Sequence, residues 1–357
     1  MHDRATGDSF VIRCADKVRD LSPAYFGLVM ATGIVALAAF MMGHRLVAIS
    51  MFYLNIVQYV VLSALYFLRL WRFPKRFFGD MFTHAVGPGY FTVVAGTGIL
   101  ASEFLILVEN VAVGAAFWGV AVLLWLCLTY AIFTALTIKR DKPTLDKGIN
   151  GAWLLAVVAT QAISVSSALL ADRIGQPYRL EINLLALSMW LLGGMLYIWL
   201  MSLIFYRYAF FRFSPDDLAP PYWINMGAMA ISTLAGSLLI LNAPQAPFLT
   251  SLLPFLKGFT LFYWATGTWW IPMLLLLGIW RHGFERFPIR YDPLYWGAVF
   301  PLGMYAACTW QMSYAMEFDF LAGLPRIFLY VAFVAWTVTF IGMLRTLFRM
   351  SCAEFRT

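Results

Sequence analysis

The feature that most constrains this chain is a series of ten long apolar runs, separated by short segments that hold most of the Arg, Lys, Pro and Asp residues. A bilayer core takes about 20 apolar residues per helical crossing, and the runs have about that length. Only 12% of the 357 residues are charged, whereas a soluble domain has roughly a quarter. We therefore expect an all-α membrane protein of ten transmembrane helices, over residues 24–42, 47–70, 85–104, 112–137, 150–170, 182–205, 222–242, 258–280, 293–313 and 326–348.

The basic residues indicate how these helices are oriented. If successive helices alternate in direction, most of the 25 Lys and Arg lie in connections on the amino-terminal side, which the positive-inside rule assigns to the cytoplasm. We expect a multi-pass protein of the plasma (inner) membrane with both termini cytoplasmic: a tail over residues 1–22, a transport domain over 23–348 and a short tail over 349–357. Orientation then explains the net charge of +7, and nucleic acid is not an expected partner.

Side chains that carry chemistry are scarce in the predicted spans. The four Cys are far apart and no two His are four residues apart within a span, so no metal site and no cofactor are expected. Glu103, Glu181 and Lys257 lie near predicted span ends, where we expect them to reach an interface. A membrane enzyme would need a convergent set of polar side chains. The sequence offers no such set, so we do not expect an enzyme.

The odd-numbered helices share a beginning that the even-numbered ones lack. Each starts with a small residue or Pro followed by an aromatic residue, which an interfacial aromatic belt would also explain. The first helix is also richer in Ala, Gly, Ser and Thr than the second, and the fifth is richer than the sixth. Such small residues allow close packing or leave room along an axis. We interpret the chain as five helical hairpins, with the odd helices forming an inner five-helix pore and the even helices an outer ring; a solid bundle without a path is the alternative. The repeated beginnings are Pro23–Gly27, Pro88–Phe91, Gly151–Trp153, Pro221–Trp223 and Pro293–Gly297.

A path without charged groups can conduct anions through hydroxyl and amide donors and an apolar constriction. In the ninth helix Phe300 precedes Pro301, so a large ring lies beside a break in helical hydrogen bonding. Phe300 is the candidate gate, and ordinary packing of its ring is the alternative. The other candidate residues of the path are Phe26, Gly27, Gly33, Thr92, Gly96, Trp153, Thr160, Asn225, Gly227, Pro301 and Gly303.

Three parts of the sequence carry a resemblance to a known family: Pro23–Gly27 with Ala31–Gly33, Asn150–Trp153, and Tyr295–Gly303. On these residues the chain resembles the tellurite-resistance/dicarboxylate transporter family, which includes bacterial tellurite-resistance channels, fungal malate permeases and plant slow-type anion channels. The resemblance implies a homotrimer in which each protomer has its own pore, lined by the odd helices and ringed by the even ones. It also implies that a Phe of the ninth helix blocks the pore, and the matching position is Phe300.

Transport of a small anion is the function that these features favour. The expected substrate is a C4-dicarboxylate such as malate, or an inorganic anion such as chloride, nitrate, sulfite or tellurite, moving across the lipid bilayer through a pore gated by Phe300. The alternative is a proton-coupled carrier for uptake or efflux of C4-dicarboxylates. The predicted spans lack an internal carboxylate, which argues against proton coupling. A membrane enzyme, or a scaffold or sensor without transport, is the hypothesis from another class.

Overall fold

The computed structural model describes residues 18–354, in which helices are joined by turns and loops and no strand occurs. Of the expected tails, residues 1–17 and 355–357 lie outside the described residues. Residues 349–354 continue the last helix. In chain order the elements are η1 Pro23–Phe26, α2 Gly27–Met41, α3 Arg45–Arg72, α4 Pro74–Met81, η2 Gly87–Tyr90, α5 Phe91–Leu107, α6 Val111–Ile138, α7 Leu145–Gly148, η3 Gly151–Leu154, α8 Leu155–Arg173, α9 Tyr178–Phe210, η4 Pro220–Trp223, α10 Ile224–Asn242, η5 Ala243–Gln245, α11 Pro247–Ser251, α12 Leu253–Ile279, η6 Trp280–Phe284, η7 Pro293–Tyr295, α13 Trp296–Met316, η8 Asp319–Leu321 and α14 Gly323–Glu354.

Nine helical segments between residues 18 and 354 are long and apolar enough to cross a membrane. They correspond to nine of the ten expected spans. The tenth, expected over 293–313, is the helix α13 with its preceding turn η7, which has the length of a span but not the hydropathy of the others. Its apolar residues are interrupted by Trp, Tyr, Pro and Gln. The other helices enclose α13, so it does not depend on contact with lipid.

Burial divides the helices into two sets. The spans that contain α2, α5, α8 and α10 have 78–94% of their most apolar stretch buried, whereas those of α3, α6, α9, α12 and α14 have 11–44%. Most of α13 is also buried. Large apolar side chains are exposed on the second set, as Leu123 of α6 and Val334 of α14 show. We call α2, α5, α8, α10 and α13 the inner helices and the second set the outer helices.

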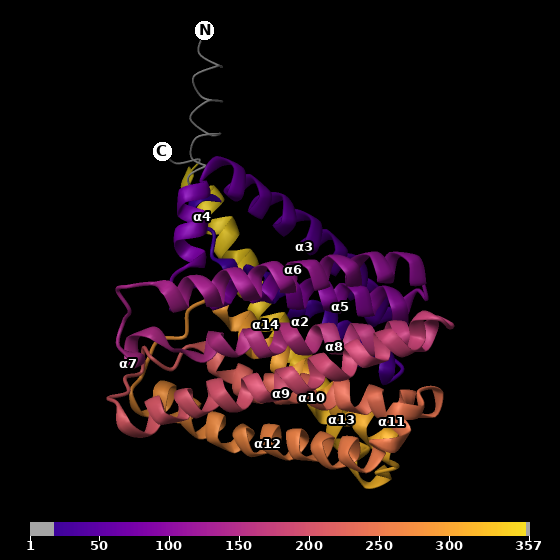
Figure 1. The fold of residues 1–357 in the computed structure, drawn as a ribbon. Helices are drawn as coiled ribbons and strands as arrows, with labels where there is room; N and C mark the ends of the chain where they lie inside the picture. The colour runs from indigo at the N-terminus through magenta and orange to yellow at the C-terminus, as the bar shows by residue number, and fades with distance from the viewer. Residues whose placement is uncertain (1–17, 355–357) are drawn as a thin grey trace.

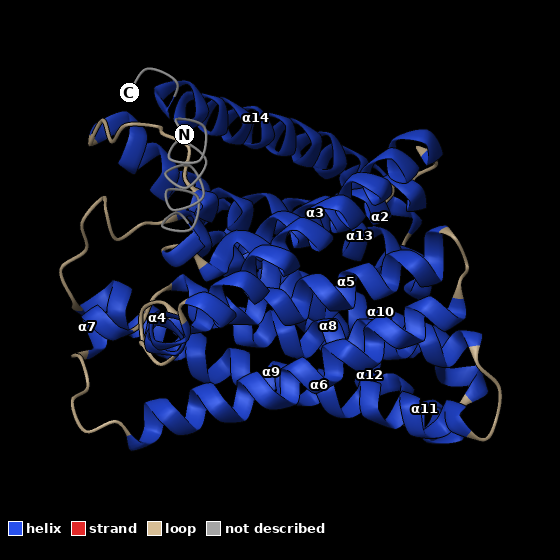
Figure 2. Ribbon diagram, turned by 90° about the horizontal axis from the view of Figure 1, so that it is seen from above, coloured by secondary structure: helices blue, strands red, loops and turns tan. Residues whose placement is uncertain are grey.

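The inner helices contact one another in cyclic order. Helix α2 contacts α5, α5 contacts α8, α8 contacts α10, α10 contacts α13, and α13 returns to α2. Each outer helix packs against two neighbouring inner helices, as α6 does between α5 and α8. The long helices run alongside one another in Figures 1 and 2, with α7 near one end of the bundle and α11 near the other.

All five inner helices begin with a tight 3₁₀ turn, and these turns also contact one another in a closed ring of η1, η2, η3, η4 and η7. Three of the turns have a side-chain cap. The side chains of Ser22, Asn150 and Asp292 each accept a hydrogen bond from the backbone N–H two residues later. Such residues satisfy amide groups that a helix start leaves without partners. The repeated beginning noted in the sequence is therefore a repeated local structure.

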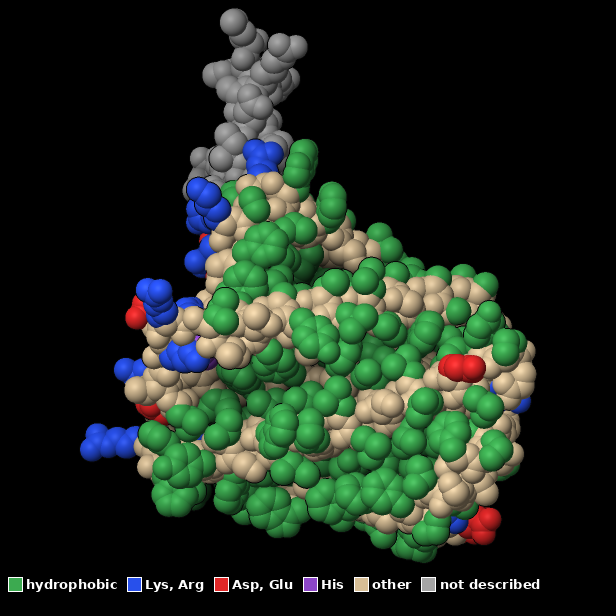
Figure 3. All heavy atoms as spheres, viewed as in Figure 1, with side chains coloured by type: hydrophobic (Ala, Val, Ile, Leu, Met, Phe, Trp, Pro, Cys, Tyr) green, Lys and Arg blue, Asp and Glu red, His purple; other side chains and the backbone are tan. Residues whose placement is uncertain are grey.

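Lys and Arg gather at the end of the bundle where these turns lie. In the face shown in Figure 3, most of the Lys and Arg side chains lie at the end near α7, and apolar side chains cover much of the rest of the face. Exposed basic residues in the connections at this end include Lys75, Arg76, Lys139, Arg140 and Lys142. This separation of charge from apolar surface is typical of a protein that crosses a membrane.

Gly227 allows α10 to approach α13 closely. A Cβ atom at Gly227 would lie 2.7 Å from Cγ of Pro301, whose rigid ring cannot move aside. We predict that Gly227→Ala destabilises the fold by about 1–3 kcal/mol, the usual range for overpacking. Thermal unfolding in detergent measures the effect. Gly258→Ala on α12 is the control, because a Cβ atom there meets nothing within 4 Å. Equal melting temperatures for Gly227→Ala and the wild type would contradict the prediction.

Candidate functional site

A small cavity lies where the five inner helices begin, and all five contribute to its wall. Its volume is about 20 Å³, which leaves room for roughly a single water molecule. Phe300 of α13 is buried on this wall, with a relative exposure of 1%. We call it the mouth cavity; its lining is Ala24, Gly27, Met30, Thr92, Ala152, Leu155, Pro221, Ile224, Leu294, Trp296, Gly297 and Phe300.

Lining positions recur at a spacing of three residues. On α2 and its turn they are Ala24, Gly27 and Met30, and on α13 with its turn they are Leu294, Gly297 and Phe300. A 3₁₀ turn repeats every three residues and an α-helix every 3.6, so residues three apart lie on one face across the junction. Each inner helix thus presents the same face to the mouth cavity. Phe300 occupies the position that Met30 occupies on α2.

A second cavity lies where the same helices end. It measures about 510 Å³, and all five inner helices again contribute to its wall. Its polar lining residues are Asp172, Asn242 and Gln311. Asn242 is itself fixed, because its Nδ2 donates to Asn183 Oδ1 and to the Ala168 carbonyl, each at 2.9 Å. We call this the far cavity. The inner helices therefore enclose a hollow at both ends.

A charged cavity of about 560 Å³ adjoins the mouth cavity, and the two share Ala152, Pro221 and Leu294. Its wall holds three basic and three acidic side chains. The formal charges of these side chains balance, so the cavity does not present a single sign of charge. The charged residues are Asp146, Lys147, Arg207, Arg212, Asp216 and Asp217.

Arg207 and Asp217 form the most buried ion pair of the charged cavity. Arg207 Nη2 donates to Asp217 Oδ1 at 2.7 Å, and Nη1 donates to the Tyr222 hydroxyl. Asp217 also accepts hydrogen bonds from the backbone N–H and the hydroxyl of Ser214. Burial raises the pKa of Asp217, but the hydrogen bonds from Ser214 and the positive charge of Arg207 outweigh it, so the pKa lies below its ordinary value. The pair ties the end of α9 to the start of the next inner helix.

We predict that Asp217→Asn lowers stability at pH 7 by about 1–3 kcal/mol, because buried Arg207 loses its counter-ion. The folded-state pKa of Asp217 is depressed, so its contribution is complete above the unfolded pKa of about 3.9 and is lost as pH falls through the folded value. The melting temperatures of Asp217→Asn and wild type should therefore converge below about pH 4. Asp216→Asn, at an exposed position in the same cavity, is the control. A difference that persists unchanged at low pH would argue against the prediction.

The candidate path residues fall into two groups. Gly27, Thr92 and Phe300 line the mouth cavity. The other nine do not line it, and several of them lie where helices contact one another. Gly96 packs on Val29 and Phe26, Gly303 on Val35, Gly227 on Pro301, and Gly33 on Asn55 and Glu103. The ring of Phe26 contacts that of Tyr66, and the ring of Trp153 contacts that of Phe133.

The hydroxyl and amide groups proposed as donors along the path point mostly to the outer helices. Thr160 Oγ1 accepts a hydrogen bond from Trp125 Nε1 of α6 at 2.9 Å, and Asn225 Nδ2 lies 3.2 Å from the Tyr208 hydroxyl of α9. Thr92 lines the cavity, but its hydroxyl donates to backbone carbonyl oxygens. Small polar residues therefore join inner helices to outer ones.

Glu103 does not reach an interface, contrary to the expectation from the sequence. It is fully buried on α5, and its Oε2 accepts a hydrogen bond from Asn55 Nδ2 of α3 at 2.6 Å. Its Oε1 has no partner. Gly33 of α2 makes room for the pair, because a Cβ atom there would lie 2.7 Å from Asn55 Nδ2. The fold buries this carboxyl because α2, α3 and α5 meet around it. Glu181 and Lys257 are exposed, as expected.

Several cavity residues were missed in the sequence. Met30, Leu155, Ile224 and Gly297 line the mouth cavity but carry no polar group to mark them. Their signal is positional, since each lies within four residues after the aromatic beginning of its helix. The acidic partner of Arg207 had no such signal.

Comparisons with known proteins place the chain in a family. The family described as SLAC1, voltage-dependent anion channel, matches residues 20–344. Two uncharacterised transporters of Methanocaldococcus jannaschii are each 24% identical to this chain, over 91% of its length and 94% or 93% of theirs. An uncharacterised membrane protein of Mycobacterium tuberculosis is 37% identical over 154 residues, which are 43% of this chain and 77% of that protein. This family is part of the tellurite-resistance/dicarboxylate transporter family that the sequence resembles. The chain is thus a multi-pass membrane protein that belongs to the voltage-dependent anion channel family.

Proposed function

We propose that small anions cross the membrane along the axis of the inner helices and that the side chain of Phe300 closes the path. The observation that carries this proposal is that one ring of five helices lines a cavity at each of its ends. A gated path requires a narrow, apolar point between wider spaces. The mouth cavity is the narrow point, with Phe300 as a large apolar side chain on its wall, and the charged cavity and the far cavity are the wider spaces.

The same proposal includes the arrangement in the membrane. The chain would cross ten times as five hairpins, with α13 as the ninth span and with the inner helices as pore and the outer helices as a lipid-facing ring. The basic end of the bundle, where the inner helices begin, would face the cytoplasm of a plasma (inner) membrane, with both termini on that side. The homotrimer rests on the family resemblance.

The wall of the mouth cavity does not by itself select the sign of the ion. None of its lining residues is charged, so an ion there interacts mainly with backbone dipoles and with charges nearby. The adjoining charged cavity holds three basic and three acidic side chains, and its Arg207 is paired with Asp217. The proposed preference for anions therefore rests on the family, which is described as voltage-dependent anion channels.

Substrate identity is proposed as a C4-dicarboxylate such as malate, or chloride, nitrate, sulfite or tellurite. The far cavity of about 510 Å³ lies within the range of small-molecule sites, about 300–1,000 Å³. Purified protein in liposomes should carry one or more of these anions down their gradients, in a panel measured with and without a pH gradient. If none of them crosses faster than in protein-free liposomes, the proposal fails.

A second candidate function is proton-coupled transport of a C4-dicarboxylate, and buried Glu103 is the observation that favours it. Ionisable groups inside a membrane protein are costly and commonly mark proton relays. Among the residues whose burial is described, Glu103 is the one buried acid. This candidate predicts that a pH gradient drives malate accumulation, whereas a simple channel only equilibrates it.

A further inference from the structure

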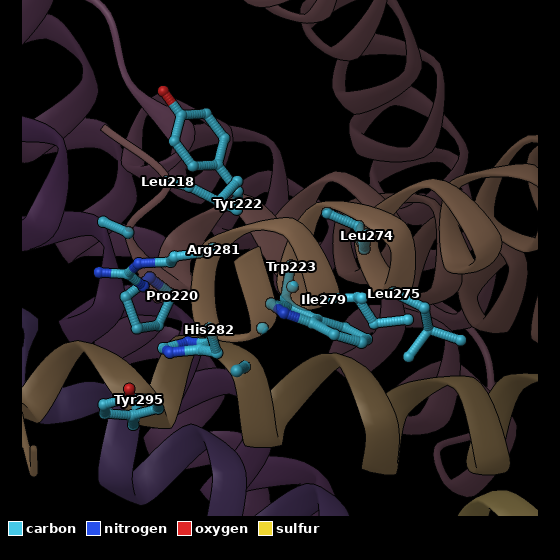
Figure 4. A pocket seen from close by; sticks show the side chains of 14 residues that line it. Leu218, Pro220, Tyr222, Trp223, Leu274, Leu275, Ile279, Arg281, His282 and Tyr295 are labelled. Atoms are coloured by element: carbon cyan, nitrogen blue, oxygen red, sulfur yellow. The ribbon is translucent and has the colours of Figure 1, made fainter. Parts of the chain in front are cut away.

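A cavity of about 570 Å³ lies between the turn η4, the end of α12 with η6, and the beginning of α13 with η7. Figure 4 shows Arg281, His282 and Tyr295 on one side of the view and Leu274, Leu275 and Ile279 on the other. Leu275 and Ile279 are also exposed on the outer surface of α12, at 52% and 57%. The cavity therefore combines a basic end with an apolar wall that faces the surroundings of the bundle. We call it the side cavity.

Arg281 is buried at the basic end without a counter-ion. Its relative exposure is 8%, and its Nε has no hydrogen-bond partner. No carboxylate lies within ion-pair distance of it in the described part of the chain. Its guanidinium lies 4.1 Å from the centroid of the Phe287 ring, which supports a cation without neutralising it. Burying an unpaired charge is costly, so such a group commonly has a ligand.

Two other arginines at the same end of outer helices are neutralised. Arg69 of α3 lies over Phe77, pairs with Asp80 at 2.5 Å and donates to the Tyr90 hydroxyl. Arg207 of α9 repeats this arrangement with Phe213, Asp217 and Tyr222.

Arg281 also lies over a Phe ring, that of Phe287, and Tyr295 at the start of the next inner helix lines its cavity. The corresponding Asp, however, bonds elsewhere. Asp292 lies eleven residues after Arg281, as Asp80 does after Arg69. In the structure, however, Asp292 Oδ1 accepts a hydrogen bond from Leu294 N at 2.8 Å and caps the turn η7. The position that an aspartate fills at the other two arginines is therefore open to an anion. Arg281 also lies in the π-helical segment η6, a type of local irregularity that is frequent at functional sites.

We propose that the side cavity binds an anionic phospholipid, with its phosphate on Arg281 and an acyl chain along Leu275 and Ile279. A free anion would not use the apolar wall, and an uncharged lipid would leave the guanidinium unpaired. The wall belongs to an outer helix at the level where a span ends, so the lipid would come from the surrounding leaflet. Arginine forks match phosphate geometry, which favours this headgroup over a weaker acceptor. The proposal does not depend on what the pore conducts.

Native mass spectrometry of the delipidated full chain tests this binding. Phosphatidylglycerol is titrated in detergent beside phosphatidylcholine, and the first lipid bound is followed. We expect Arg281→Gln to weaken the first phosphatidylglycerol by about tenfold, the loss expected for a charge-assisted hydrogen bond, and to leave phosphatidylcholine unchanged. Arg290→Gln, at an exposed position nearby, is the matched control and should bind like the wild type.

A second variant keeps the arginine and fills the apolar arm. Gly278 lines the cavity and a Cβ atom there meets nothing within 4 Å, so the side chain of Gly278→Leu begins in open space at the cavity wall. It should also weaken the first phosphatidylglycerol, and it serves if Arg281→Gln does not fold. Unchanged affinity in both variants overturns the proposal. Three other results would also overturn it. Displacement of the lipid by inorganic phosphate would assign the cavity to a soluble anion, and equal binding of phosphatidylcholine would assign it to a nonspecific lipid. A change in oligomer mass without loss of lipid would assign it to a second copy of the chain.

Discussion

Phe300→Ala is expected to increase anion conductance at least about tenfold, which corresponds to lowering the barrier by about 1.4 kcal/mol. The ring of Phe300 lies on the wall of a cavity of about 20 Å³, and its removal widens the narrowest described point of the path. A wider and wetter constriction lowers the cost of moving an anion through it. Currents in oocytes, normalised to the amount of protein at the surface, measure the effect.

Phe91→Ala is the matched control. Phe91 is as buried as Phe300 and lies near the start of another inner helix, but its ring packs against Phe133 of an outer helix. Its loss removes the same atoms from the protein without enlarging the mouth cavity. We therefore expect no increase in current. If Phe300→Ala conducts no better than the wild type, Phe300 is not the gate; if both variants increase current equally, a general loosening of the bundle is the cause.

Glu103→Gln is expected to abolish accumulation of malate driven by a pH gradient, if the protein couples transport to protons. Glutamine has the shape of glutamate and can accept the hydrogen bond from Asn55 Nδ2, but it cannot release a proton. Downhill flux of malate should persist, since Glu103 is not among the residues lining the mouth or far cavity. Proteoliposomes loaded at one pH and diluted into another measure both quantities.

Glu181→Gln is the control for this prediction, because Glu181 is exposed at the start of an outer helix. It should accumulate malate like the wild type. Gradient-driven accumulation that survives in Glu103→Gln would exclude Glu103 as the coupling group. A wild-type protein that never accumulates malate would favour a channel and leave Glu103 with a structural role.

Much of the fold could be predicted because the relevant signals are local. Apolar runs located the ten expected spans, and the aromatic beginnings marked the inner helices at Pro23, Pro88, Gly151, Pro221 and Pro293. Nine of the spans are apolar enough to cross a membrane by hydropathy, whereas the ninth in chain order, which carries the same beginning, has a lower hydropathy. The short helix α4, which carries Asp80, was not expected, because it is a surface element that follows Pro74 rather than an apolar run.

The candidate site was less accessible from the sequence. Thr160 was expected on the path because it is a polar residue on an inner helix, yet its hydroxyl bonds to Trp125 of an outer helix. A hydroxyl on a buried helix can face an axis or a neighbour, and the direction depends on which helices surround it. Phe300, by contrast, was expected from the break at Pro301 and lies on the wall of the mouth cavity; its action as a gate stays a prediction.

The sequence by itself determined that this chain crosses a membrane many times, because partition into a bilayer depends on runs of about 20 residues that can be read one at a time. It also determined which helices begin alike. Only the tertiary structure decided which polar groups are paired. Buried Glu103 accepts a hydrogen bond from Asn55, which is 48 residues away in the sequence. Arg281 lacks a counter-ion because Asp292 caps a turn instead. Burial and pairing depend on contacts between segments that are distant in sequence, and these exist only once the helices have packed.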